Sequence, residues 1–290
     1  MCAETDYVLF CDKALLILMK KLIYNNPESK KAPQIPIFDS LSHPTLSGSL
    51  NGRPADFKAL CRSLRQANFV GACAVGLATV ENYEHELFIL ECSKFSELIP
   101  IAGINLDCLE SDLEQEMDLV SKMGFKGVKV HPRISKVAYS HPNLAKLFVM
   151  AERRGLVVFL CTYAHCKLEH YPNTDPFYEI VQAIKLVPRV KVILVHGGDV
   201  SLLRYAELVR FSPNLLLDLS MTFMKYSGSS IDLDLQFLFN SFDQRICIGS
   251  DHPEYSHKQI RQKFNIFAKD LPLEKAQNIA SKNILTFLSR

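Results

Sequence analysis

The sequence lacks several features that mark whole classes of protein. Its 33 lysine and arginine residues face 31 aspartate and glutamate residues, a formal net charge of +2 with histidine neutral. Without a basic excess, a dedicated nucleic-acid binder is not expected. The N-terminal segment has Glu4 and Asp6 where a secretory signal needs positive charge, and its longest uninterrupted apolar stretch, ALLILM, has six residues. Neither export nor a membrane span, which needs about 20 apolar residues, is predicted.

The chain also lacks the cysteine pattern of a disulfide framework. Its nine cysteines form an odd set, and most lie inside apolar runs such as GACAVG and RICIGS. Buried reduced cysteine behaves as a small hydrophobic residue, and reduced thiols are typical of the cytosol. We therefore predict free thiols and a cytoplasmic location.

What the sequence does contain is a series of short apolar runs. With 48% hydrophobic and 22% charged residues, the composition is that of a globular chain. Eight runs rich in apolar and β-branched residues begin 24 to 35 residues apart, about the length of a strand–helix unit. These predicted strands are IPIFDSL (35–41), FVGACAVG (69–76), LIPIAGIN (98–105), FKGVKVHP (125–132), LVVFLCT (156–162), KVILVHG (191–197), LLLDLS (215–220) and RICIGSD (245–251).

Stretches with helical apolar spacing lie between the runs, at 55–68, 109–124, 142–155, 175–188 and 200–211. Two of them end at Gly124 and Gly155, where a helix C-cap places glycine. Strands that are apolar on both faces are parallel strands covered on both sides. The fold predicted is an α/β protein, a (β/α)8 TIM barrel over residues 35–290 with an N-terminal helical extension over residues 1–34. An open doubly wound sheet is the alternative. The GxGxxG motif that often follows the first strand of such a sheet is absent here, which favours the barrel.

In such a barrel the active site forms at the carboxyl ends of the strands. Polar residues gather at these ends. They are Asp39, His43, Lys129, His131, Cys161, Thr162, His165, His196, Asp218, Asp251 and His252. Singly, each has an ordinary structural role, such as capping a turn or packing in a core. Together they would place several ionisable groups in one cleft, at a cost of several kcal/mol unless a cation or a substrate compensates.

A divalent metal is the compensating cation that this set favours. His43, Cys161, His196 and Asp251 offer imidazole nitrogen, thiolate sulfur and carboxylate oxygen, all of which zinc accepts. Three protein ligands and a water molecule would leave the open position that a hydrolase needs.

Lys129 is the second informative residue. Strand alternation places Lys129 and His131 on the same side, opposite Val128 and Val130. If that side is the barrel interior, the ammonium group needs a carboxylate, a bound anion or a chemical modification. Two interpretations stay open, a pair with an acid on a neighbouring strand such as Asp218 and a role in substrate binding.

These strand-end motifs resemble those of the amidohydrolase superfamily, in the branch of TIM-barrel metal-dependent hydrolases that includes aromatic-acid decarboxylases. The resemblance covers about residues 35–288 and rests on IFDSLSHP, GFKGVKVHP, LVVFLCT, VILVHGGD, NLLLDLS, GSDHP and NIASKNILTFL, in that order. It implies metal or catalytic roles for His43, His196 and Asp251. Two positions depart from the family pattern: Leu41 replaces the first histidine of an Asp-x-His-x-His motif, and Cys161 stands where the fifth strand usually ends in histidine.

The first functional hypothesis is a hydrolase that cleaves a C–N or C–O bond, as in an amide, ester or lactone, through a metal-activated water. The resemblance implies that Asp251 takes the proton from that water and that His196 orients or polarises the scissile carbonyl. Lys129, His131 and Arg133 would face anionic parts of a small polar substrate. Decarboxylation within the same superfamily is the related alternative, and a homo-oligomer is a possible assembly.

Leu41 favours a different class, a barrel without metal that acts as a binding or regulatory protein. A third hypothesis makes Cys161 a nucleophile, with His165 or His196 as its base. The loops at 164–175 and 221–232 are predicted to cover the site and to determine specificity.

Overall fold

The computed structural model describes residues 34–78, 80 and 82–289. The predicted extension at residues 1–34 lies outside these residues except for Gln34, so its boundary stays a prediction. Within the described part of the chain, no helix is long and apolar enough to cross a membrane.

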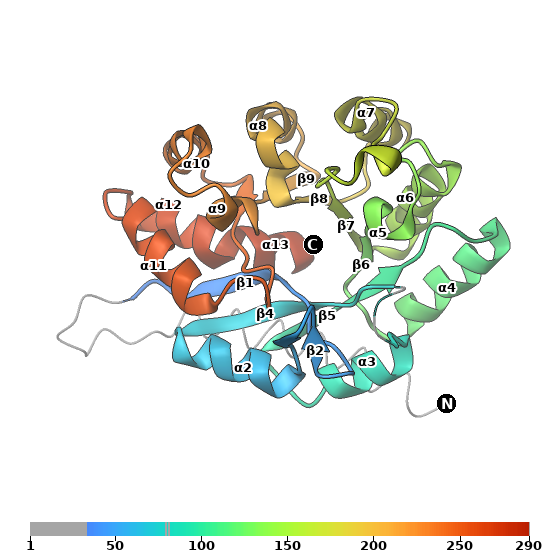
Figure 1. The fold of residues 1–290 in the computed structure, drawn as a ribbon, viewed down its shortest axis with the longest axis horizontal. Coiled ribbons are helices and arrows are strands. Elements are labelled where there is room, and N and C mark those ends of the chain that lie inside the picture. Colours follow the sequence, from blue (N-terminus) through green and yellow to red (C-terminus); the bar gives the residue numbers. More distant parts are fainter. Residues whose placement is uncertain (1–33, 79, 81, 290) are drawn as a thin grey trace.

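Eight parallel strands form one sheet in which consecutive strands are neighbours, so the open-sheet alternative is wrong. Each strand overlaps one of the eight predicted runs. Figure 1 shows the strands at the centre of the molecule with the helices around them. The strands are β1 (Ile37–Ser42), β4 (Phe69–Val75), β5 (Leu98–Ile104), β6 (Gly127–Val130), β7 (Val157–Cys161), β8 (Val192–Val195), β9 (Leu215–Asp218) and β10 (Ile246–Cys247).

The barrel closes at a seam between β1 and the segment after β10. β10 itself pairs only with β9. Beyond it, the Ser40 N–H donates to the Ile248 carbonyl at 3.1 Å, and the Asp251 N–H donates to the Leu41 carbonyl at 2.9 Å. The predicted eighth strand at 245–251 is therefore regular over two residues only. Its remainder is irregular but still hydrogen-bonded to β1, which fixes the position of Asp251.

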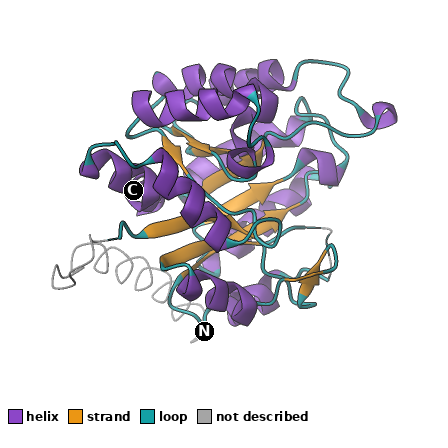
Figure 2. Cartoon of the chain, turned by 60° about the vertical axis from the view of Figure 1, so that its left-hand side comes forward, coloured by secondary structure: helices purple, strands orange, loops and turns teal. Residues whose placement is uncertain are grey.

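Helices connect the strands and pack on the outside of the barrel, as Figure 2 shows. All five predicted helical stretches are present, and Gly124 and Gly155 follow α4 and α6 with positive φ angles of 91° and 65°. The helices are α2 (Phe57–Gln66), α3 (His85–Cys92), α4 (Glu110–Lys122), α5 (Pro132–Ser135), α6 (Pro142–Arg154), α7 (Pro176–Leu186), α8 (Leu202–Arg210), α9 (Thr222–Lys225), α10 (Ser230–Ser241), α11 (His257–Phe267), α12 (Leu273–Gln277) and α13 (Asn283–Ser289), with short 3-10 or π turns at Leu168–His170, His196–Ser201 and Asn278–Lys282.

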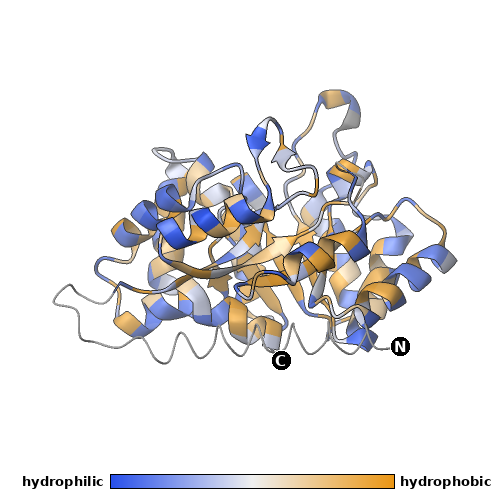
Figure 3. Cartoon of the chain, turned by 90° about the horizontal axis from the view of Figure 1, so that it is seen from below, coloured by the Kyte–Doolittle hydropathy of each residue, from blue (hydrophilic) through white to orange (hydrophobic). Residues whose placement is uncertain are grey.

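The core has two layers, one between strands and helices and one inside the barrel. The inner layer includes Phe38, Val157 and Phe159, and side chains of α13 such as Leu285 pack against it. Figure 3 shows the strands as the most hydrophobic part of the chain, with polar positions on the surrounding helices. Because side chains alternate along a strand, the inner layer decides which residues reach the end of the barrel.

A small hairpin in the loop after β1 was not predicted. Its strands are β2 (Ser49–Leu50) and β3 (Arg53–Pro54). The Arg53 guanidinium donates to the Glu254 carbonyl oxygen at 2.6 Å and pairs with the Glu254 carboxylate at 3.0 Å. The hairpin is thereby tied to the loop that follows β10, on the side of the barrel where the polar strand ends lie.

Candidate active site

A cavity of about 190 Å³ opens at the carboxyl ends of the strands. Four of the eleven polar strand-end residues named from the sequence line it, and the hairpin supplies two further wall residues. The lining consists of His43, Leu50, Asn51, Leu77, Val80, His131, Arg133, Ile134, Tyr163, His196, Met221, Asp251, Pro253 and Glu254.

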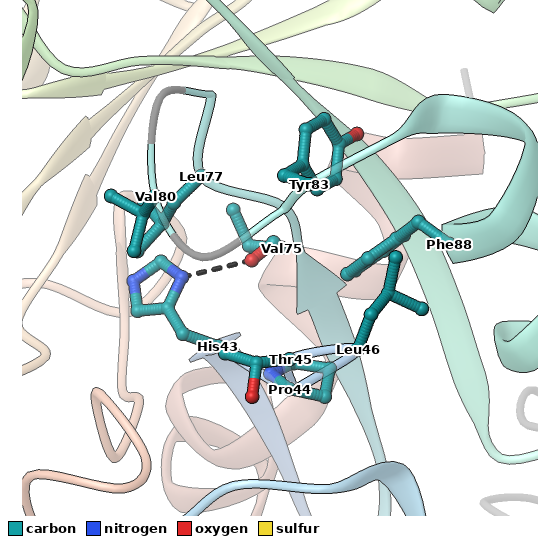
Figure 4. A pocket seen from close by; sticks show the side chains of 9 residues that line it. All are labelled: His43, Pro44, Thr45, Leu46, Val75, Leu77, Val80, Tyr83 and Phe88. Carbon is teal, nitrogen blue, oxygen red and sulfur yellow. Dashed lines mark hydrogen bonds between the residues drawn. The ribbon is translucent and has the colours of Figure 1, made fainter. Parts of the chain in front are cut away.

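His43 follows the last residue of β1 and has a fixed ring orientation. Its Nδ1 lies 2.9 Å from the carbonyl oxygen of Val75, the last residue of β4, as Figure 4 shows. Since a carbonyl oxygen only accepts hydrogen bonds, Nδ1 carries a proton. Nε2 is then the nitrogen left for a ligand, and it lies 3.4 Å from Oδ1 of Asp251.

His196 follows β8 and is held in the same way. Its Nδ1 donates to the Ser220 carbonyl oxygen at 3.1 Å. Burial lowers the pKa of His196 to about 4, although the nearby Asp251 acts in the opposite direction. At neutral pH the ring is therefore uncharged, with a lone pair on Nε2.

Asp251 supplies the negative charge of the cavity. Burial acts to raise the pKa of Asp251, but the charge of His196 and the hydrogen bond and charge of His43 outweigh it and lower the pKa below its ordinary range. The side chain is 16% exposed. Asp251 is therefore an ionised, mostly enclosed carboxylate beside the imidazole rings of His43 and His196.

Four cavity residues adopt a backbone conformation that residues other than glycine rarely use. One is Asn51, in the hairpin turn, with a φ angle of 51°. The φ angles of His196, Met221 and Asp251 are 69°, 60° and 53°. These three follow the successive strands β8, β9 and β10. A left-handed conformation costs about 1–3 kcal/mol per residue and is concentrated at functional sites. The fold thus holds strained backbone at the positions where these side chains enter the cavity.

Lys129 and His131 share one face of β6, as predicted, and both have an unsatisfied polar atom. Lys129 is 1% exposed. Its Nζ and the Nδ1 of His131 are buried and have no hydrogen-bond partner in the described part of the chain. Burial lowers the pKa of Lys129, more than the nearby Cys161 and Asp251 raise it. The interpretation that pairs Lys129 with Asp218 is wrong, because no ion pair joins them.

Cys161 and His165 do not reach the cavity lining. Cys161, the last residue of β7, is fully buried, and burial raises the pKa of its thiol. A buried thiol of raised pKa is a poor nucleophile. Nε2 of His165 pairs instead with Oδ2 of the buried Asp199 at 3.2 Å. Neither residue is arranged as a catalytic Cys–His pair.

The sequence did not reveal the partner of Asp39. Its Oδ2 lies 2.8 Å from Nε2 of His257, 218 residues later on α11, and its Oδ1 accepts the N–H groups of Leu41 and Ser250. Burial acts to raise the pKa of Asp39, but the hydrogen bond and charge of His257 lower it overall. Asp39 therefore caps a turn, the structural role considered above, and it fixes the residue before Asp251.

Two imidazole nitrogens and a carboxylate suit a divalent metal by their chemistry. Metal-bound histidines commonly donate their second ring N–H to a backbone carbonyl, as His43 and His196 do. Over residues 34–78, 80 and 82–289, however, no three His, Cys, Asp or Glu side chains lie close enough together to hold an ion as they stand. Leu41, fully buried on β1, supplies no ligand. The donors therefore fit a metal by their chemistry, although their side chains are not gathered around one point in the described residues.

Comparisons with known proteins agree with this architecture. A sequence profile described as amidohydrolase matches residues 48–289. An uncharacterised TIM-barrel protein from Bordetella bronchiseptica is 16% identical with a TM-score of 0.73, over 88% of this chain and 100% of the other. The 5-carboxyvanillate decarboxylase of Sphingomonas paucimobilis is 11% identical with a TM-score of 0.66, over 88% of this chain and 99% of the other. A zinc-bound amidohydrolase from Burkholderia multivorans is 13% identical with a TM-score of 0.66, over 88% of this chain and 99% of the other. No curated protein matches the chain by sequence.

Proposed function

Because the chain belongs to the amidohydrolase family, we propose that it is a hydrolase that cleaves a C–N or C–O bond of a small polar substrate in the cavity described above. One observation carries the proposal. His43, His196 and Asp251 come from three separate strand ends and line a single cavity of about 190 Å³. This arrangement favours an enzyme over the binding or regulatory barrel that Leu41 suggested.

We assign the metal site to His43, His196 and Asp251, with Cys161 as a fourth ligand if its thiol is deprotonated. Zinc is the ion that suits nitrogen, oxygen and sulfur donors best. When bound, a divalent ion lowers the pKa of a water molecule and polarises a carbonyl group.

The protein's own groups divide the proton transfers between them. Asp251, ionised at neutral pH, accepts the proton of the attacking water. His196 carries its proton on Nδ1, so its Nε2 accepts a hydrogen bond, a proton or a metal ion. The polarising role expected for His196 requires a second proton on this ring, which its pKa of about 4 disfavours at neutral pH. We therefore assign His196 to orientation of the substrate, through a hydrogen bond or a metal ion accepted by its Nε2.

The substrate carries a negative charge in this proposal. Arg133 lines the cavity and stacks on Tyr163, with its guanidinium carbon 5.2 Å from the ring centre. No carboxylate of the described residues pairs with Arg133. The guanidinium charge gives the cavity wall a positive potential that attracts an anionic group. We assign His131 and Lys129 to hydrogen bonding with that group. The same wall favours the second candidate, decarboxylation, in which the substrate's carboxylate is the reacting group.

Metal content is the first test. Protein purified without added metal is expected to hold about one zinc ion per chain by elemental analysis, and Asp251→Asn to lose it. Asp243→Asn is the matched control, because Asp243 is exposed and outside the cavity. Absence of any metal in the wild type, together with unfolding that chelator does not alter, contradicts the metal site.

Activity is the second test. Anionic amides, esters and lactones are offered together with aromatic carboxylates, and the products distinguish hydrolysis from release of carbon dioxide. Turnover that needs Asp251 and Arg133 but yields carbon dioxide selects the decarboxylase. Tight binding of such compounds without turnover selects the binding protein.

The cellular setting is part of the proposal. We infer a cytoplasmic protein, supported by seven cysteines of the described residues that form no disulfide. A homo-oligomer stays a prediction that measurement of the molecular mass in solution can test.

A further inference from the structure

The side chain of Lys129 is not explained by packing or by pairing. It extends from β6 into the barrel interior, is 1% exposed and ends in an Nζ that has no hydrogen-bond partner among the described residues. Stacked beside it on β7, Phe159 occupies the neighbouring register position. An unpaired ammonium group in such surroundings is costly, so the fold favours the neutral amine.

The amine lies just beneath the cavity. His131, two residues farther along the same face of β6, lines the cavity. The charge of Lys129 also influences the pKa values of three cavity-lining residues, His131, His196 and Asp251. Lys129 therefore lies one side-chain layer below His131, a residue that a small molecule in the cavity would contact.

We propose that Lys129 is a nucleophilic amine that forms a covalent iminium with the carbonyl carbon of a small oxo acid bound in the cavity. A lysine that is desolvated in an apolar pocket is the type that forms such adducts with carbonyl compounds. An oxo acid fits because the guanidinium of Arg133, which pairs with no carboxylate of the described residues, lies on the cavity wall where it can bind the substrate's carboxylate.

The step balances with groups that the site contains. The lone pair of Nζ forms a bond to the carbonyl carbon while the carbon–oxygen π electrons move to oxygen, which takes a proton. The amine proton passes to His131, whose Nδ1 is buried and unpartnered. The resulting hydroxyl group leaves as water after receiving a proton, and the C=N⁺ bond forms. The net change joins the neutral lysine amine, one ketone or aldehyde and one proton taken up from solvent, and it releases one water molecule.

The inference goes beyond the proposed hydrolysis and does not depend on it. An iminium carries one positive charge, so adduct formation adds an electrostatic attraction for an anionic group. It also withdraws electrons from the neighbouring carbon, which is the chemistry that breaks an adjacent bond to a carboxylate or acyl group. Metal content and metal-dependent hydrolysis are unaffected if the adduct does not form.

Reductive trapping tests the inference. Wild-type protein is incubated with pyruvate and sodium cyanoborohydride, and the intact mass and tryptic peptides are measured. We expect one reduced adduct per chain, on Lys129, with labelling that saturates at low pyruvate concentration. Acetone, which lacks a carboxylate, is expected to label Lys129 at least about 10-fold less efficiently, since a charge-assisted pair with Arg133 contributes about 1.4 kcal/mol or more.

Two variants sharpen the result. Lys129→Met removes the amine and is expected to abolish the saturable adduct, whereas Lys225→Met, at a more exposed lysine near the mouth, is expected to leave it unchanged. Adducts spread over surface lysines with Lys129 unmodified overturn the proposal, and this result needs only the wild type. The proposal can therefore be overturned even if the Lys129→Met variant does not fold. Labelling of Lys129 that is equal for pyruvate and acetone overturns the assignment to an oxo acid.

Discussion

Asp218 is a buried carboxyl group whose removal has a pH-dependent effect on stability. It ends β9, is fully buried, and its Oδ1 accepts the Ser220 N–H at 2.7 Å while Ser40 donates to Oδ2 at 3.3 Å. Burial raises the pKa of Asp218 from 3.8 to about 7, against the hydrogen bonds of Ser220 and the charge of Lys129. In Asp218→Asn the amide keeps the shape, accepts from Ser220 and donates towards Ser40, but it does not titrate.

The sign follows from proton linkage. Because the folded state holds the proton more tightly than the unfolded chain, the contribution of Asp218 to stability is complete below pH 3.8. It is lost as the pH rises through about 7. A difference of about three pKa units corresponds to about 4 kcal/mol over the full range, and about 2–3 kcal/mol of it falls between pH 5 and 8. Over that interval Asp218→Asn should therefore gain about 2–3 kcal/mol relative to the wild type.

Urea unfolding at pH 5, 6, 7 and 8 measures this difference. The difference between the two proteins is the quantity to follow, because titrating groups common to both cancel. Asp243→Asn, at an exposed position, controls for the general effect of removing a negative charge. Parallel stability curves for wild type and Asp218→Asn would refute the reasoning, since they mean that Asp218 has the same pKa folded and unfolded.

Four further outcomes are expected. Asp251→Asn lowers kcat by about 100-fold or more on any hydrolysed substrate, because the variant loses its proton acceptor. Leu41→His adds a ligand beside the cavity and tightens zinc binding in a chelator competition. Gly198 has a φ of 77°, and a Cβ there would overlap the facing tyrosine ring, so Gly198→Ala lowers the free energy of unfolding by about 2 kcal/mol or more. Gly52 has a φ of 74° but faces open space, so Gly52→Ala lowers the free energy of unfolding by about 1 kcal/mol. Finally, burial lowers the pKa of His196 to about 4, so between pH 6.5 and 4 only the unfolded chain takes up a proton at this residue. The wild type therefore loses stability as the pH falls through this range. Urea unfolding of His196→Gln should show a smaller loss.

The strands could be predicted because their signal is local. Runs such as KVILVHG and LVVFLCT are apolar over their whole length, which is the pattern of a strand covered on both faces. Their even spacing then indicated eight strand–helix units. The exception is the eighth run, where regular pairing covers only Ile246–Cys247. Hydrogen bonds to β1, more than 200 residues away, determine the rest of that segment, and no local pattern reports them.

Positions at strand ends also indicated the site. His43, His131, Arg133, His196 and Asp251 all line the cavity. Depth within the barrel was not predictable in the same way. Lys129 and Cys161 lie below the lining, because the length of each strand and its register with its neighbours set the layer that a side chain occupies.

By itself, the sequence determined the type and order of the elements and the end of the barrel where polar groups gather, since both follow from the spacing of residues along one strand or helix. Only the tertiary structure decided which ring nitrogens of His43 and His196 face a ligand and that His257 is the partner of Asp39. It also decided that the amine of Lys129 has no hydrogen-bond partner within residues 34–78, 80 and 82–289. These properties depend on hydrogen bonds and desolvation between segments far apart in the chain, and such contacts exist only once the barrel has closed.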